Sequence, residues 1–156
     1  MKEYLSKDLI LPELSCGDKE SVLKEISAFI ARATKLDEKN ILNTLKDREK
    51  LGSTGVGDGI AIPHGKMENL QKPLVSVARK SDGVDFQSID NKPVKILVTL
   101  LTPASDPACH LGLLARLTRI LTSQDFKIKL LQAKDEDEIY RLFLDEDQKM
   151  IGLGVW

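Results

Sequence analysis

The sequence is short of the residues that build several common kinds of functional site. Its 156 residues include two cysteines, two histidines and only 4% aromatic residues, and the formal net charge at pH 7 is −1. A charge so near zero, without a run rich in lysine or arginine, argues against a nucleic-acid-binding surface. Cys16 and Cys109 lie far apart and lack the spacing of a disulfide framework, which is typical of reduced thiols in a cytosol.

Long apolar segments are also missing. The longest such run, residues 96–101, is far too short to span a bilayer. The N-terminal segment has no signal-peptide core, because it is interrupted by Lys2, Glu3, Lys7 and Asp8. We therefore expect a cytoplasmic protein without direct membrane insertion. The length fits a single domain, 1–156, that is large enough to bury a core.

Apolar residues at helical spacing, introduced by capping residues, predict a series of helices. The first helix follows Asp18 and covers residues 19–33, and the second follows Asp37 and ends at residues 48–50. The third follows Asp106, with Pro107 in the first helical position, and reaches residue 121. The fourth follows Ser123 and runs through residue 131, and the last follows Asp135. The apolar tail, residues 150–156, is expected to pack back on the domain, with self-association as the alternative.

Strands are predicted at residues 60–62, 74–78 and 94–101, the last apolar enough to be central. Turn-forming residues occupy 81–83 and 90–93. Residues 4–16 read as a helical turn followed by an edge strand that Pro12 keeps short. Together these elements predict an α/β fold in one domain, with a mixed, mostly parallel sheet flanked by helices on both faces.

Residues 52–66 form the most unusual stretch of the chain, with five of its ten glycines and one of its two histidines. An apolar strand runs into Pro63, which ends it, and His64 follows between Pro63 and Gly65. The glycines alternate and lead into a strand rather than a helix, unlike a dinucleotide fingerprint. Lys66 lacks the Ser or Thr that a P-loop requires after it.

His64 is the main candidate for chemistry, because a neutral imidazole is a nucleophile suited to phosphoryl transfer. Arg48 offers a bidentate clamp for phosphate oxygens. Ser53, Thr54 and glycine N–H groups such as that of Gly65 could donate further hydrogen bonds. The alternative is a sharp surface turn with an incidental histidine.

His110 lies on the apolar face of its predicted helix, one turn before Leu114. It is either a satisfied core residue or a neutral ring that bonds a phosphoryl group or orients another histidine. A zinc site made of Cys16, Cys109, His64 and His110 is disfavoured, because no C-x-x-C or H-x-x-x-H pair exists. We expect no metal and no cofactor.

Residues 48–66, R-E-K-L-G-S-T-G-V-G-D-G-I-A-I-P-H-G-K, resemble the active-site signature of the fructose/mannitol-type enzyme IIA domains of the bacterial phosphoenolpyruvate phosphotransferase system. His110 begins a segment, H-L-G-L-L-A-R-L, similar to the family's second histidine motif. The resemblance extends over about residues 14–144. The sequence of residues 48–66 and 89–94 is most similar to that of the nitrogen-regulatory branch, whose members are stand-alone IIA proteins.

The resemblance implies that His64 accepts a phosphoryl group from HPr or an HPr-like carrier, that His110 assists, and that Arg48 helps to bind phosphate. A nitrogen-regulatory protein would then bind regulatory targets according to its phosphorylation state. A fructose- or mannitol-type IIA subunit would instead pass the phosphoryl group to a IIB component. A metal-dependent hydrolase is a third and weaker alternative.

Overall fold

The computed structural model describes residues 1–154, and its sheet is built around the two longest strands, β5 (Leu74–Val84) and β6 (Val94–Pro103). These pair antiparallel through the centre of the molecule, and nearly every residue of β6 is buried. The full strand order is β1-β5-β6-β3-β2, with β4 also paired to β6. The remaining strands are β1 (Ile10–Leu11), β2 (Gly55–Gly57), β3 (Ile60–Ala61) and β4 (His64–Met67).

The sheet is mixed, as predicted. β1 pairs with β5 in parallel, and β3 and β4 each pair with β6 in parallel. β2 pairs antiparallel with β3. Parallel pairings therefore outnumber antiparallel ones, although the longest pairing, β5 with β6, is antiparallel. β1 is a short edge strand followed by Pro12, also as predicted.

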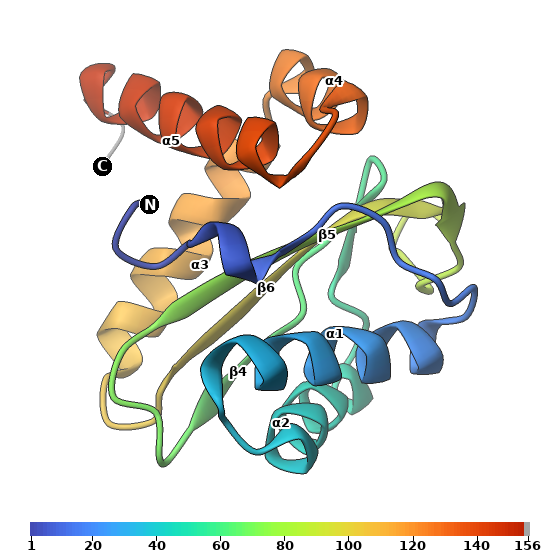
Figure 1. Cartoon of the computed structure of the whole chain (residues 1–156), viewed down its shortest axis with the longest axis vertical. Coiled ribbons are helices and arrows are strands. Elements are labelled where there is room, and N and C mark those ends of the chain that lie inside the picture. The colour runs from blue at the N-terminus through green and yellow to red at the C-terminus, as the bar shows by residue number, and fades with distance from the viewer. Residues whose placement is uncertain (155–156) are drawn as a thin grey trace.

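Helices cover both faces of the sheet, with α1 and α2 on one side and α3, α4 and α5 on the other (Figure 1). Each helix begins after the capping residue that the sequence predicted, whose side-chain oxygen accepts a backbone N–H in the first turn. The bounds are α1 (Lys19–Thr34), α2 (Glu38–Lys50), α3 (Pro107–Leu121), α4 (Gln124–Gln132) and α5 (Glu136–Gly152), with a short 3₁₀ helix at Lys7–Leu9.

Two local predictions need correction. Residues 81–83 do not form a turn but continue β5, with an irregular register opposite β6 and Gly83 at φ +80°. Hydrogen bonds from Ser81 to the Glu13 carboxylate hold this part of the strand. The tail is partly helical, because α5 continues to Gly152.

In the tail, Met150 packs against the core, whereas Ile151 and Leu153 are exposed. The expected packing of the tail is therefore only partial over this part. Val155 and Trp156 lie outside the described residues.

β3 and β4 are two pieces of one interrupted strand along the same edge of β6. Ile60 and Ala61 pair with residues 96 and 97 of β6, and His64 to Met67 pair with residues 100 to 103. Between them, Ile62 and Pro63 form no residue pair with β6: Pro63 has no N–H to donate, although its carbonyl accepts the N–H of Leu100 at 2.9 Å. The strand ends near Pro63 as predicted, but pairing resumes at once, so His64 opens a strand instead of standing on a turn.

Candidate active site

The imidazole of His64 is fixed through both of its nitrogens. Nδ1 lies 2.7 Å from the carbonyl oxygen of Ile62, which accepts hydrogen bonds but cannot donate one. Nδ1 therefore carries the proton. Nε2 accepts a hydrogen bond from Nε of Arg48 at 3.1 Å. The ring is thus a neutral Nδ1–H tautomer whose Nε2 lone pair is the nucleophilic position.

Burial is the main influence that lowers the pKa of His64 below its usual 6.5. The positive charge of Arg48 lowers this pKa further, while the hydrogen bond to the Ile62 carbonyl raises it. The net direction is downward. The ring consequently stays unprotonated at neutral pH, as a nucleophile must.

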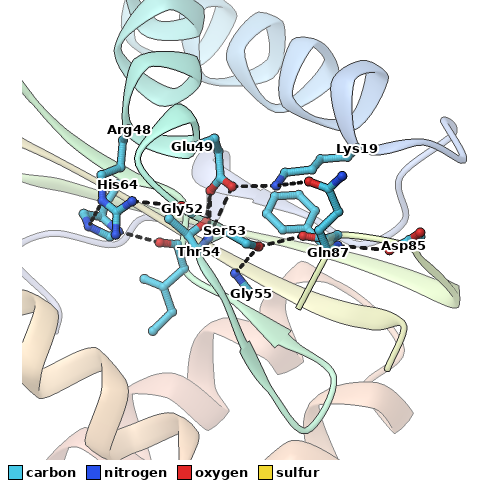
Figure 2. Close-up of polar contacts among 12 residues, drawn as sticks. Lys19, Arg48, Glu49, Gly52, Ser53, Thr54, Gly55, His64, Asp85 and Gln87 are labelled. Carbon is cyan, nitrogen blue, oxygen red and sulfur yellow. Dashed lines mark hydrogen bonds and ion pairs between the residues drawn. The ribbon is translucent and has the colours of Figure 1, made fainter. Parts of the chain in front are cut away.

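Arg48 reaches His64 from the last turn of α2, and its guanidinium has a second anchor. One terminal nitrogen, Nη1, donates to the carbonyl of Gly52 at 3.0 Å, just beyond the end of the helix. Figure 2 shows the side chain lying between His64 and Gly52. The guanidinium therefore stands beside the nucleophilic nitrogen, where its donors can turn to phosphate oxygens.

His110 lies in the first turn of α3, which Asp106 caps through the N–H of Cys109. Its ring centroid is 5.5 Å from that of His64, with the ring planes tilted by 47°. Its Nδ1 lies 2.7 Å from Oγ1 of Thr102, a fully buried residue of β6. Burial, then the neighbouring His64 and Lys66, lower the pKa of His110, so this ring is also neutral.

Both histidines and Arg48 line one shallow depression of about 570 Å³. Its other lining residues come from α2 and the residue that follows it, from β4 and from α3: Thr44, Asp47, Leu51, Gly65, Lys66, Leu111 and Leu114. Two of the leucines are strongly exposed, Leu51 at 83% and Leu111 at 67%. The two histidines and Arg48 thus lie at an open surface with apolar residues beside them.

Glu49, the neighbour of Arg48, forms a second cluster that the sequence analysis did not single out. Its carboxylate is nearly buried, accepts hydrogen bonds from the backbone N–H of Thr54 at 3.1 and 3.2 Å, and also contacts the Thr54 hydroxyl. Nζ of Lys19 in α1 lies 2.7 Å from the same carboxylate and 4.7 Å from the Phe86 ring centroid. The available signal in the sequence was the carboxylate of Glu49 within the signature of residues 48–66, whereas Lys19 lies far outside it. Figure 2 shows this cluster.

The hydroxyls of Ser53 and Thr54 are directed away from His64. Ser53 donates to the carbonyl of Phe86 at 2.7 Å and accepts from the N–H of Gly55 at 3.1 Å. Thr54 is buried against Glu49. The structure therefore brings Arg48, His64 and His110 together without these two hydroxyls, and their role as phosphate ligands stays a prediction that no contact supports.

Gly65 has a packing requirement of its own. A Cβ atom at this position would lie 2.3 Å from Cγ2 of Thr44, so only glycine lets α2 approach β4 this closely. The missing side chain therefore makes room for a helix of the same chain. Its N–H as a phosphate donor stays a prediction.

Cys109, which precedes His110, is a half-buried free thiol whose pKa is raised by burial and then by Asp106. Among residues 1–154, no group of three or more His, Cys, Asp or Glu side chains is arranged to hold a metal ion. Over the same residues, no helix has the length and apolarity needed to cross a membrane.

Two neutral histidines and an arginine thus meet in one depression, at an edge of a mixed sheet with helices on both faces. Residues 3–146 match the family described as "Phosphoenolpyruvate-dependent sugar phosphotransferase system, EIIA 2". The chain belongs to this family, and the resemblance seen in its sequence is confirmed.

Relatives of two kinds are similar to the chain. The nitrogen regulatory protein of Bradyrhizobium diazoefficiens is 40% identical over 138 residues, which cover 88% of this chain and 90% of that protein. The fructose-specific EIIA component of Haloferax volcanii is 36% identical over 133 residues, which cover 85% of this chain and 86% of that protein. The crystal structure of nitrogen regulatory protein IIA-Ntr from Neisseria meningitidis superposes with a TM-score of 0.84 at 28% identity, covering 90% and 96%.

Proposed function

We propose that this chain is a cytoplasmic phosphocarrier in which Nε2 of His64 accepts a phosphoryl group from a phosphohistidine on HPr or a nitrogen-type HPr-like protein. The observation that supports this most directly is the pair of hydrogen bonds on the His64 ring. The Ile62 carbonyl keeps the proton on Nδ1, so the lone pair of Nε2 is available without removal of a proton.

Transfer then needs one bond to form and one to break. The Nε2 lone pair attacks the phosphorus atom, and the bond between phosphorus and the donor histidine breaks, returning its electron pair to the donor ring nitrogen. Arg48 gives up its hydrogen bond to Nε2 and donates instead to the phosphoryl oxygens, whose charge it offsets.

The surroundings of the site favour a protein as the donor. A shallow depression with exposed Leu51 and Leu111 beside it does not enclose a small molecule. It does offer apolar contact area to the surface of a carrier. The transferred phosphoryl group adds up to two negative charges beside His64, which would change the affinity for other proteins at this face.

We further propose that the chain serves as a nitrogen-regulatory protein, which binds regulatory protein targets according to its phosphorylation state. The 40% identity to the Bradyrhizobium nitrogen regulatory protein supports this assignment. The alternative is a fructose- or mannitol-type IIA subunit that passes the phosphoryl group to a IIB component, which the similarity to the Haloferax fructose-specific component supports.

The test is intact-mass spectrometry after incubation with phosphoenolpyruvate, enzyme I and an HPr-type carrier. Wild type should gain one acid-labile phosphoryl group, His64→Ala should gain none, and His110→Ala should gain it more slowly. An adduct that persists in folded His64→Ala would overturn the assignment of the nucleophile. Rapid loss of the group to a purified fructose- or mannitol-type IIB would favour the sugar-transfer alternative.

A further inference from the structure

The partner of His110 differs in kind from the partner of His64. The Ile62 carbonyl can only accept, which fixes the proton of His64 without ambiguity. The Thr102 hydroxyl can donate or accept, so the proton of His110 depends on what else that hydroxyl can bond. Within residues 1–154, Thr102 Oγ1 has no hydrogen-bond partner other than Nδ1 of His110.

This isolation decides the direction of the bond. Thr102 is fully buried, and a buried hydroxyl whose hydrogen has no acceptor is destabilising. If Nδ1–H of His110 donated to Oγ1, the hydroxyl hydrogen would have nowhere to go. If the hydroxyl donates to Nδ1, its hydrogen is satisfied, and the ring proton must then lie on Nε2.

We propose that Thr102 is a positioning residue that holds His110 in the Nε2–H tautomer, so that this ring donates a hydrogen bond to the phosphoryl group at His64. The two rings then present opposite functions to one depression. His64 offers a lone pair on Nε2, and His110 offers a proton on Nε2, with the ring centroids 5.5 Å apart. The role in transfer rests on the proposed function, but the tautomer does not.

The geometry also explains why the donor can be neutral. A hydroxyl that donates to Nδ1 stabilises the unprotonated nitrogen and opposes formation of an imidazolium ring. Lys66, the register partner of Thr102 on β4, adds positive charge on the same side. His110 therefore donates a hydrogen bond while its ring is neutral. The ring then holds no additional proton that could be lost to solvent when the phosphoryl group leaves.

The experiment compares Thr102→Val, which removes the hydroxyl at nearly constant shape, with Thr102→Ser, which keeps it. Thr99→Val is the matched control, since Thr99 is also buried in β6 but lies an odd number of residues away, on the opposite face of the sheet. Long-range ¹H–¹⁵N spectra of the histidine rings report which nitrogen carries the proton. Rates of phosphorylation by an HPr-type carrier are measured in parallel.

We expect wild type, Thr102→Ser and Thr99→Val to show His110 protonated on Nε2, and Thr102→Val to show a mixture of tautomers. Phosphorylation should slow by about tenfold in Thr102→Val and stay near the wild-type rate in the other two. His64 should remain an Nδ1–H tautomer throughout, which checks that the fold is intact.

Protonation of His110 on Nδ1 in the wild type would overturn the proposal. So would an unchanged tautomer in folded Thr102→Val, or a changed tautomer with an unchanged rate. If no variant is phosphorylated by any carrier, the proposed function fails while the spectra still decide the tautomer.

Discussion

Arg48 and Glu49 are neighbours in the sequence, yet they belong to two different parts of the molecule. Arg48 reaches the half-buried ring of His64, beside an open depression. Glu49 is turned to the nearly buried cluster with Thr54 and Lys19. Successive residues of a helix point about 100° apart, so the last turn of α2 serves both. Figure 2 shows the two clusters side by side.

The difference shows that a recognisable signature is not a list of reacting groups. Arg48 keeps a donor next to a nucleophile, where its bonds can be exchanged for bonds to phosphate. Glu49 has its bonds satisfied inside the protein, where exchanging them would leave buried partners unpaired. One residue is therefore expected to control rate, and the other to control stability.

The largest effect is expected for Glu49→Ala. This change leaves Lys19 and the backbone N–H of Thr54 without their carboxylate, and it should lower the free energy of unfolding by about 3 kcal/mol. Urea denaturation measures the change. Glu20→Ala, which removes an exposed carboxylate paired with Lys24 and Lys46, is the control and should cost about 0.5 kcal/mol or less. Equal costs for the two variants would contradict the comparison.

Arg48→Met should show the reverse pattern. Removing a donor that stabilises the phosphoryl oxygens should slow phosphorylation roughly a hundredfold, with the free energy of unfolding changed by less than about 1 kcal/mol. Single-turnover transfer from a phosphorylated carrier measures the rate. Arg48→Lys keeps the positive charge but lacks the planar guanidinium, so its rate of phosphorylation should lie between those of the wild type and Arg48→Met. A rate near that of the wild type would remove Arg48 from the reacting site.

A smaller effect is expected for Gly65→Ala, which places a methyl group against Cγ2 of Thr44. The free energy of unfolding should fall by about 2 kcal/mol because the contact is too close. Thr44→Ser removes the opposing methyl group, so the double variant should regain most of that loss in a double-mutant cycle. Purely additive effects would show that the close approach of α2 to β4 is not what Gly65 provides.

The smallest effect concerns pH. Burial, then Arg48, lower the pKa of His64 in the folded chain, so the rate of phosphorylation should hold to a lower pH than an imidazole of the usual pKa of 6.5 would allow, and fall in more acidic solution. In Arg48→Met the pKa of His64 should rise, because a positive charge and a hydrogen bond to the unprotonated nitrogen are both removed. An NMR titration of the His64 ring measures this shift. A lower pKa in the variant would contradict the placement of Arg48 as a donor to Nε2 of His64.

Much of this architecture was predictable because the signals are local. Capping residues such as Asp18 and Asp106 act within one helical turn, and the apolar run in β6 is typical of a central strand. The turn expected at 81–83 was wrong because its residues are held by Glu13, far away in the chain. The helix boundaries were therefore more predictable than the ends of β5.

The residues of the candidate site also differ in how far the sequence predicted them. The neighbouring Pro63 and Gly65 in the sequence drew attention to His64 as the candidate nucleophile. Arg48 and His110 were candidates from their residue types and positions, and the family resemblance then gave each a role. Thr102 carries no mark in the sequence beyond being a polar residue within an apolar strand. Its importance arises only when β6 and α3 are packed together, which places its hydroxyl on Nδ1 of His110.

The interruption at Ile62 and Pro63 bears on how this protein could carry information. The carbonyl of Ile62, between β3 and β4, faces Nδ1 of His64, so the ring is hydrogen-bonded to the main chain at the edge of β6. A phosphoryl group on Nε2 leaves the hydrogen bond between Nδ1 and the Ile62 carbonyl in place. We therefore expect the free and phosphorylated forms to share one backbone conformation. A partner would then distinguish them by the charge at a fixed position on the surface, not by a change of shape.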